Sequence, residues 1–430
     1  MNIKYRLVIM NFLQYAIWGA YLTSMARYLG PVGFGDEIGL FYSILGIVSI
    51  FMPAIMGIIA DKLVPAQRLL GLSHLLSALF IIGAGYYGFM AGNNVSFPIF
   101  FSLFSLSGAF YMPTLALSNS VAFSILKDND FDTVKHFPQI RISGTIGFVA
   151  SMWTVDLLGF QTTPAQFLMS GILGLVLFLY TFTLPACSIT RSNKNQSFSE
   201  RMGMTAFKLF KQKKMAVFFI FAALLGISLQ ITNGFANPFI SSFEAIPMYA
   251  TTFGVQHSNI LVSLSQISET FCILLIPLFF KQMGIKKVML IAMGAWVLRF
   301  FLFACGNPGT GVWFLVFSMV VYGVAFDFFN VAGSLFVDGE IDINNRSSAQ
   351  GLFFLMTNGI GATVGTLAAQ QVVNQFCSWQ TVNIKGVTKS LLLGDWTSVW
   401  LIFAGYSLIV MVAFALVFKN GVEKPAGKLR

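Results

Sequence analysis

The chain has 430 residues, of which 56% are hydrophobic and 10% charged, and its mean hydropathy is +0.77. Soluble domains are usually about 45–50% apolar and about 25% charged, so this composition excludes an ordinary water-soluble protein and predicts a membrane protein. The net charge of +10 could suggest nucleic-acid binding. The placement of the basic residues gives this charge another role, and we predict no nucleic-acid partner.

Apolar stretches of about 20 residues, the length that crosses the hydrocarbon of a bilayer, recur along the whole chain. The first stretch lacks the small-residue cleavage site of a signal peptide, so we predict that it is a membrane span. We predict an all-α membrane protein with twelve transmembrane helices, near residues 5–29, 38–60, 67–90, 96–125, 139–159, 165–185, 215–240, 257–280, 287–304, 312–335, 347–375 and 397–418. Twelve spans are typical of a transporter.

The basic residues are distributed unequally between the loops on the two sides of these spans. An even number of spans places both termini on one side, and the loops on that side hold most of the 26 basic residues. The opposite loops hold only Arg27, Lys385 and Lys389. This asymmetry follows the positive-inside rule and predicts cytoplasmic termini. The basic charge then sets topology, although contact with acidic membrane lipid stays possible.

Polar and aromatic residues interrupt the first span. Gln14 and Trp18 are four apart, so they share one helical face and could line a cavity. Trp and Tyr also gather at membrane interfaces for reasons unrelated to a ligand, and this alternative stays open for Tyr15.

The fifth span follows a polar loop and carries a cation. Its first turns, in the string FPQIRISGTIGF, place Arg141 and Thr145 one turn apart, and Gly144 and Gly147 allow another backbone to approach closely. The fork of Arg141 can donate several hydrogen bonds to a carboxylate or a polar ligand. The alternative is an interfacial arginine that reaches to the lipid headgroups.

A long polar interval, rich in Ser, Asn and Lys, divides the spans into six and six. We therefore predict an N-terminal six-helix half at 1–185, a cytoplasmic linker at 186–214, a C-terminal six-helix half at 215–420 and a tail at 421–430. Two halves of this kind suggest an internal repeat, with the transported molecule held between them near mid-membrane.

The eighth span carries Gln266 and Glu269, which are three apart and share a face. A carboxylate at mid-membrane costs about 2.5–3.5 kcal/mol on insertion scales, so it is expected to face a partner, a cavity or a transported species. A structural bond to a neighbouring helix is the alternative.

Two further spans carry matching polar groups. The seventh has Gln230 and Asn233 on one face, and the tenth has Tyr322 and Phe326 four apart, followed by Asp327. Amides and carboxylates beside aromatic rings suit a polar, planar ligand. Because such pairs recur in three spans of the same half, we predict a binding site there.

Enzymatic motifs are absent from the sequence. The four cysteines form no C-x-x-C motif, the three histidines lack HExxH-like spacing, and no phosphate-binding G-x-x-x-x-G-K-[ST] loop is present. We therefore predict no enzyme, no metal and no cofactor. Transport would be driven by an ion gradient or by the gradient of the substrate itself.

A family resemblance runs through these same segments. The strings that carry it are FMPAIMGIIADK, YMPTLALSN, FPQIRISGTIGF, LQITNGFAN, QHSNILVSLSQISET, AWVLRF, VYGVAFDFFN and SAQGLFFLMTNG. In this order they closely resemble bacterial nucleoside permeases of the nucleoside:proton symporter family, from about Met1 to Asn420. The segment GIIADKLVPAQR also resembles the loop between helices 2 and 3 of the major facilitator superfamily.

The resemblance implies the major facilitator fold and the import of nucleosides, such as uridine or adenosine, with protons across the bacterial inner membrane. We expect a functional monomer. The residues implied as substrate contacts are Arg141, Thr145, Gln230, Asn233, Gln266, Glu269, Tyr322 and Phe326. Asp327 is implied in proton coupling, with Glu269 as the second candidate.

One segment departs from the family pattern. The extracellular link at 376–396 is longer than expected and reads WQTVNIKGVTKSLLLGDW over most of its length. The alternatives to a nucleoside symporter are a sugar or drug permease of the same fold and, from a different class, a membrane receptor or enzyme.

Overall fold

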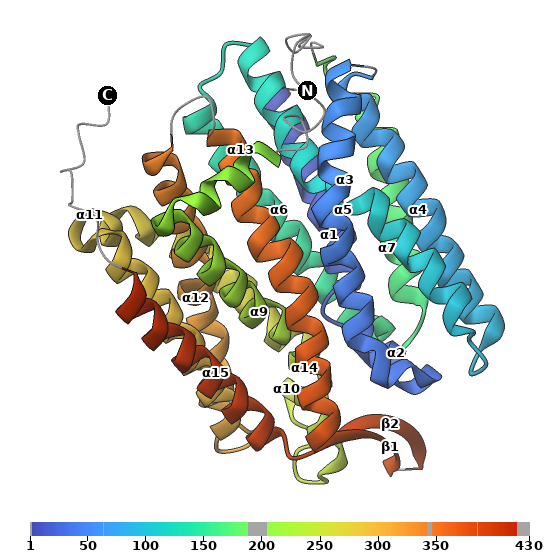
Figure 1. The fold of residues 1–430 in the computed structure, drawn as a ribbon. Helices are drawn as coiled ribbons and strands as arrows, with labels where there is room; N and C mark the ends of the chain where they lie inside the picture. Colours follow the sequence, from blue (N-terminus) through green and yellow to red (C-terminus); the bar gives the residue numbers. More distant parts are fainter. Residues whose placement is uncertain (1, 63, 188–203, 342–345, 385, 419–430) are drawn as a thin grey trace.

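The structure is a computed structural model that describes residues 2–62, 64–187, 204–341, 346–384 and 386–418. Long helices lie side by side, and α1 begins at the same end of the molecule at which α15 ends (Figure 1). We call this end the terminal end. The opposite end carries a short helix, α2, and a β-hairpin (Figure 1).

The first group of helices comes from the N-terminal part of the chain. It comprises α1 (Ile3–Gly19), α2 (Met25–Leu29), η1 (Gly30–Phe34), η2 (Gly35–Glu37), α3 (Ile38–Lys62), α4 (Ala66–Ala91), α5 (Phe97–Asp128), α6 (Thr133–Leu157), η3 (Phe160–Thr162) and α7 (Ala165–Thr181). Helix α1 packs on α6, and α4 packs on both α5 and α7.

The second group begins inside the predicted linker at 186–214, of which residues 188–203 lie outside the described part. It comprises η4 (Met204–Lys211), α9 (Lys213–Ser242), η5 (Phe243–Ala245), α10 (Phe253–Gln256), α11 (Ser258–Cys305), α12 (Val312–Glu340), α13 (Arg346–Phe354), η7 (Leu355–Gly361), α14 (Ala362–Phe376), β1 (Cys377–Ile384), β2 (Val387–Gly394) and α15 (Trp396–Val417). Helix α11 packs on both α12 and α15.

Helix α11 contains two of the predicted spans. Arg299 donates a hydrogen bond to Ser265 at 3.3 Å although the two residues are 34 positions apart. In a straight helix that separation would be about 51 Å. The element therefore folds back into two antiparallel limbs, which correspond to the predicted spans at 257–280 and 287–304.

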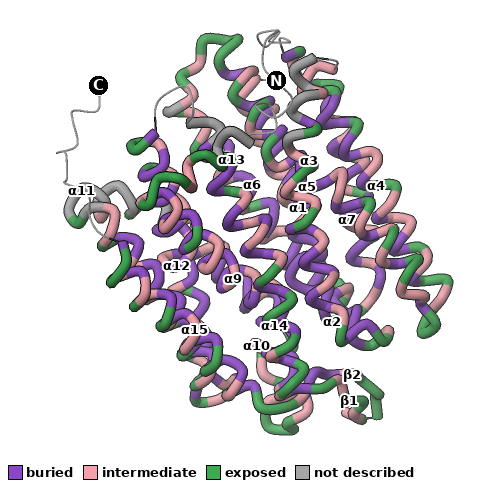
Figure 2. The backbone as a smooth tube through the Cα atoms, viewed as in Figure 1, coloured by how far each residue is buried: buried purple, intermediate pink, exposed green. Residues whose placement is uncertain are grey.

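Every predicted span is helical in the described part of the chain. Eight helical stretches there are long and apolar enough to cross a membrane by length and composition. The other predicted spans correspond to α1, α6, α7 and the first limb of α11. Figure 2 shows buried backbone where the helices face one another, and large apolar side chains such as Leu416 and Ile409 are exposed on the outside. Such an exterior suits lipid and confirms the helical membrane fold.

The segment at 376–396 forms a hairpin, which the sequence did not reveal. Strands β1 and β2 pair antiparallel, with Cys377 opposite Gly394. The Trp379 indole lies so close to Gly30 and Gly35 of the first helix group that a Cβ atom at either glycine would overlap it. The hairpin of the second group therefore contacts the first group directly.

Candidate functional site

A cavity of about 780 Å³ lies between the two helix groups. Its lining comes from α1, α3, α5 and α6 of the first group and from α9, α11, α12 and the α13–η7 segment of the second. Phe207 of η4 and Gln350 of α13 line it near the terminal end. The cavity therefore extends from the middle of the bundle toward the terminal end.

All eight predicted substrate contacts line this one cavity. They are Arg141, Thr145, Gln230, Asn233, Gln266, Glu269, Tyr322 and Phe326. They come from α6 of the first group and from α9, α11 and α12 of the second. The helix packing therefore brings together residues that are up to 185 positions apart in the sequence.

Arg141 faces the cavity from α6. Its guanidinium lies 4.3 Å from the centre of the Tyr15 ring, in a cation–π contact with α1. The close packing of α6 on α1 that Gly144 and Gly147 predicted is present, because Gly147 lies against the backbone of Phe12. This position differs from that of an arginine reaching to headgroups on the outside of the bundle.

The amides of the second group are partly unpaired. The Asn233 side-chain nitrogen donates to the Gln230 side-chain oxygen at 3.1 Å. The Gln266 side-chain oxygen is buried and has no hydrogen-bond partner among the described residues. A buried amide oxygen without a partner is costly, so a ligand that donates to it would bind favourably.

Two aromatic rings form part of the wall. The rings of Tyr322 and Phe326 are nearly parallel, at 5° and 5.5 Å between centres. Asn330, one turn further along α12, donates to the carbonyl oxygen of Phe326 at 3.0 Å. A flat ring of a ligand can contact this pair through dispersion and stacking.

Asp327 lies behind the cavity wall and is 3% exposed. One of its carboxylate oxygens is buried without a hydrogen-bond partner among the described residues. It lies near enough to Glu269 and Arg141 to interact with both electrostatically. Structural pairing of Asp327 with Arg299 would be a simpler role, but Arg299 bonds to Ser265 and to the Ser318 carbonyl, and the described residues show no ion pair between the two.

Of the two side chains predicted to line a cavity from the first span, one does so and one does not. Trp18 lines the cavity, as its face predicted. Gln14 does not, because its side chain points into the first helix group, where it bonds to Thr114 and His74 at 2.7 Å each. The two share a helical face, but Gln14 lies one turn away and meets α4 and α5 instead of open space.

Sequence reasoning missed Asn119 of α5, which lines the cavity with a buried, unpartnered side-chain oxygen. Phe148 of α6 and Asn358 of η7 were also missed as lining residues. Asn119 could have been found from the sequence, because it is an amide inside an otherwise apolar span. Phe148 gives no such signal, because phenylalanine is common on every face of these helices.

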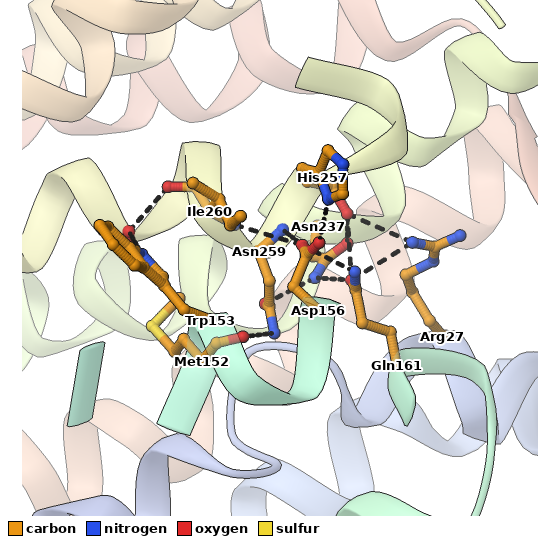
Figure 3. A network of polar contacts seen from close by, with 11 residues as sticks. Arg27, Met152, Trp153, Asp156, Gln161, Asn237, His257, Asn259 and Ile260 are labelled. Carbon is orange, nitrogen blue, oxygen red and sulfur yellow. Dashed lines mark hydrogen bonds and ion pairs between the residues drawn. The ribbon is translucent and has the colours of Figure 1, made fainter. Parts of the chain in front are cut away.

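The end opposite the termini is closed by polar contacts between the two helix groups, which we call the closed end (Figure 3). Asp156 at the end of α6 accepts hydrogen bonds from the backbone N–H groups of Asn259 and Ile260, at 3.0 and 3.3 Å. These are the free N–H groups at the start of α11, so one group of helices caps a helix of the other. His257 contacts the second Asp156 oxygen at 2.5 Å.

Charged residues extend this closure. Arg27 of α2 pairs with Glu244 of η5 at 3.0 Å, and Lys389 of the hairpin pairs with the other Glu244 oxygen at 2.6 Å. Asn237 of α9 donates to Gln161 of η3 at 3.2 Å (Figure 3). In the sequence Arg27 and Lys389 are visible only as loop charges, and their partners at the closed end were not predicted.

Similarity to known proteins agrees with this geometry. The family model described as "Nucleoside H+ symporter" matches residues 1–423. The chain is 44% identical to nucleoside permease NupG of Escherichia coli, covering 99% of each chain, and 43% identical to xanthosine permease of the same organism, covering 97% of this chain and 96% of the other.

Solved structures give the same result. The fold matches a crystal structure of nucleoside transporter NupG with a TM-score of 0.85 and 44% identity, covering 98% of this chain and 100% of the other. A mutant of the same transporter, with an aspartate replaced by alanine, matches with a TM-score of 0.89 and 43% identity over 97% and 100%.

The fold and the cavity define a multi-pass membrane transporter of the major facilitator type and not an enzyme. The chain belongs to the nucleoside H+ symporter family. Its function is the symport of nucleosides with protons.

Proposed function

We propose that the protein imports nucleosides with protons across a bacterial inner membrane by alternating access, with both termini in the cytoplasm. The excess of basic residues in the loops at the terminal end supports this orientation. The cavity that extends toward the terminal end is then the inward-facing site, and the closed end faces the outside.

The two moving bodies in this proposal are residues 1–185 and 215–420, joined by the linker at 186–214. Helices α1 to α7 pack mainly on one another, as do α9 to α15, and the cavity lies between them. This division supports rocking of one half against the other around a fixed site. We expect the monomer to be sufficient, because the cavity is lined by a single chain.

The eight lining residues named above are the proposed nucleoside contacts. Arg141 and Thr145 would bind from the first half, and the amides of Gln230, Asn233 and Gln266 would bind from the second. Ribose hydroxyls suit Glu269, and the base suits the parallel rings of the α12 wall. Uridine and adenosine, which share the ribose and differ in the base, are the proposed substrates.

Asp327 is the proposed coupling site, and Glu269 is chiefly a ligand contact. A carboxyl group removed from water can take up and release a proton near neutral pH when its neighbours change. Asp327 has an unpartnered oxygen outside the cavity lining, so its proton need not be shared with the ligand. Glu269 is on the lining beside Gln266 and can bind ligand hydroxyls.

The single observation that carries the proposal is that polar residues of both halves meet in one cavity while retaining unpaired acceptors. It is tested by uptake of labelled uridine and adenosine in cells without their own nucleoside transporters. Both should accumulate, and an uncoupler should abolish the accumulation. Ribose should not exchange for uridine in counterflow. Accumulation that survives the uncoupler, or equal exchange of ribose, would contradict the proposal.

Orientation requires a separate test. Green fluorescent protein fused after the last residue fluoresces only when it folds in the cytoplasm, so a C-terminal fusion should be fluorescent. A dark fusion at normal expression, with an active N-terminal fusion of a periplasmic reporter, would reverse the proposed topology.

A further inference from the structure

We propose that Arg299, which lies behind the cavity wall, is a positioning residue that holds Tyr322 and strengthens its hydroxyl as a hydrogen-bond donor to the transported nucleoside. The inference rests on the proposed function only in that Tyr322 is a ligand contact.

Arg299 is a buried cation that forms no ion pair with a carboxylate among the described residues. It is 1% exposed and lies on the second limb of α11. One terminal nitrogen donates to the Ser318 carbonyl at 2.7 Å and to Ser265 at 3.3 Å, and its Nε has no partner among the described residues. Burying a charge without a counter-ion is costly, so another interaction must offset part of that cost.

The aromatic faces around Arg299 provide this interaction. The central carbon of its guanidinium lies 4.6 Å from the centre of the Tyr322 ring and 5.1 Å from that of Phe303. A cation over an aromatic face is attracted by the ring quadrupole, and the attraction grows when both groups are removed from water. The Arg299 charge is therefore directed onto a ring of the cavity wall.

Tyr322 is held by three groups. Besides Arg299, it lies parallel to Phe326 at 5.5 Å and edge-on to Trp296 at 5.9 Å and 89°. Its hydroxyl has no hydrogen bond to a described residue, and Tyr322 lines the cavity. The ring is thus fixed while its polar end stays available.

The charge also changes the chemistry of the hydroxyl. A cation beside a phenol ring stabilises electron density on that ring, so the O–H proton carries more positive charge and donates a stronger hydrogen bond. Acceptors on a nucleoside include the carbonyl oxygens or ring nitrogens of the base and the ribose oxygens. Arg299 would therefore favour solutes that present an acceptor at this position.

A purely structural role for Arg299, joining α11 to α12 through Ser318 and Ser265, gives a different prediction. Loss of that role should affect folding and transport whether or not Tyr322 has its hydroxyl. Loss of the positioning role should weaken binding only when the hydroxyl is present. A double-mutant cycle separates the two.

The test measures uridine affinity by calorimetry on purified protein for Arg299→Met, Tyr322→Phe and the double variant. We expect each single variant to bind about tenfold more weakly. In the Tyr322→Phe background, Arg299→Met should change the affinity less than twofold. The inference would be overturned if the double variant lost affinity by the product of the two single losses. It would also be overturned if Arg299→Met bound uridine as tightly as the wild type.

Two further variants keep the test interpretable. Ser265→Ala removes a hydrogen bond of Arg299 but leaves its charge on the ring, so its affinity should equal that of the wild type. If Arg299→Met does not fold, Arg299→Gln, which also removes the charge, takes its place in the cycle, with the same required loss of effect in the Tyr322→Phe background. Absence of uridine binding by the wild type would refute the proposed function instead.

Discussion

The closed end and the cavity are built from the same kinds of polar residue, yet they use them differently. At the closed end Asp156, Gln161, Asn237 and Asn259 bond to one another, and the Asn237–Gln161 and Asn259–Asp156 bonds join the two halves. In the cavity some of the corresponding groups remain unpaired among the described residues, as the buried side-chain oxygen of Gln266 illustrates.

The difference shows how the same types of polar side chain can close one end of the transporter and bind a ligand in its cavity. Polar groups that satisfy each other across an interface hold that interface shut, and polar groups left without partners favour a ligand that supplies them. The closed end should therefore control which state the protein occupies. The cavity should control affinity.

The largest effect is expected for Asp327, a carboxylate that lies neither in the cavity lining nor at the closed end. Asp327→Asn keeps the shape of the side chain and removes its titration, so pH-driven accumulation of nucleoside should collapse while binding and counterflow persist. The measurement is uptake into proteoliposomes with an imposed pH gradient. Continued accumulation with the usual dependence on external pH would show that another group couples the proton.

The next largest effect should come from breaking the closed end. Asp156→Ala leaves two backbone N–H groups of α11 without an acceptor, at about 1–3 kcal/mol each, so the outward-open population should rise about tenfold or more. Spin labels at Leu158 and Met248, both exposed near this end, should report longer distances.

The matched control for this change is Asp395→Asn at the same end. Asp395 caps α15 within one half by bonding to Ser398, so its loss breaks no contact between halves. Its label distances should equal those of the wild type. Equal distances in Asp156→Ala as well would mean that Asp156 does not hold the closed end.

A smaller effect is expected for single amides of the cavity. Gln266→Ala and Asn233→Ala should each weaken nucleoside binding by about 1–3 kcal/mol, because buried groups of the ligand lose their partners. Calorimetry on the folded variants measures this loss. Gln67→Ala, at a buried glutamine outside the cavity lining, should leave the affinity unchanged. Wild-type affinity in both cavity variants would remove them from the site.

The smallest effect concerns acid stability. Hydrogen bonds from the Ser398 hydroxyl and backbone N–H lower the pKa of Asp395 below its usual range. Its charged form therefore stabilises the folded state above the ordinary aspartate pKa of about 3.9, and this contribution is lost as the pH falls through the lower folded value. Asp395→Asn should have a melting temperature that depends less on pH in this acid range. An unchanged pH dependence would contradict the cap's role.

The sequence predicted the spans well, because a 20-residue apolar stretch can only be a helix in lipid. It also indicated the second-half lining, where Gln266 and Glu269 stand out as polar groups in an apolar span. These positions are visible because polar residues inside spans are costly and therefore rare.

The closed end could not be predicted in the same way. Asp156 lies near the end of its span, where a charge is inexpensive, and its partners come from α11, about 100 positions away. The fold of the 376–396 segment was equally hidden, since the contact of Trp379 with two glycines depends on the packing of the halves. Pairings between distant residues leave no local pattern in a sequence.

The depth of the cavity has an electrical consequence. Water and its ions can enter a space of about 780 Å³ that polar side chains help to line, and they carry the potential of the terminal side into the middle of the bundle. The membrane voltage then falls mainly across the thin remaining barrier, at about 2.3 kcal/mol per elementary charge for each 100 mV. Arg27, Glu244 and Asp156 lie within that barrier. Any displacement of these charges as the closed end opens would be driven or opposed by the voltage, so the membrane potential itself would bias which way the transporter faces.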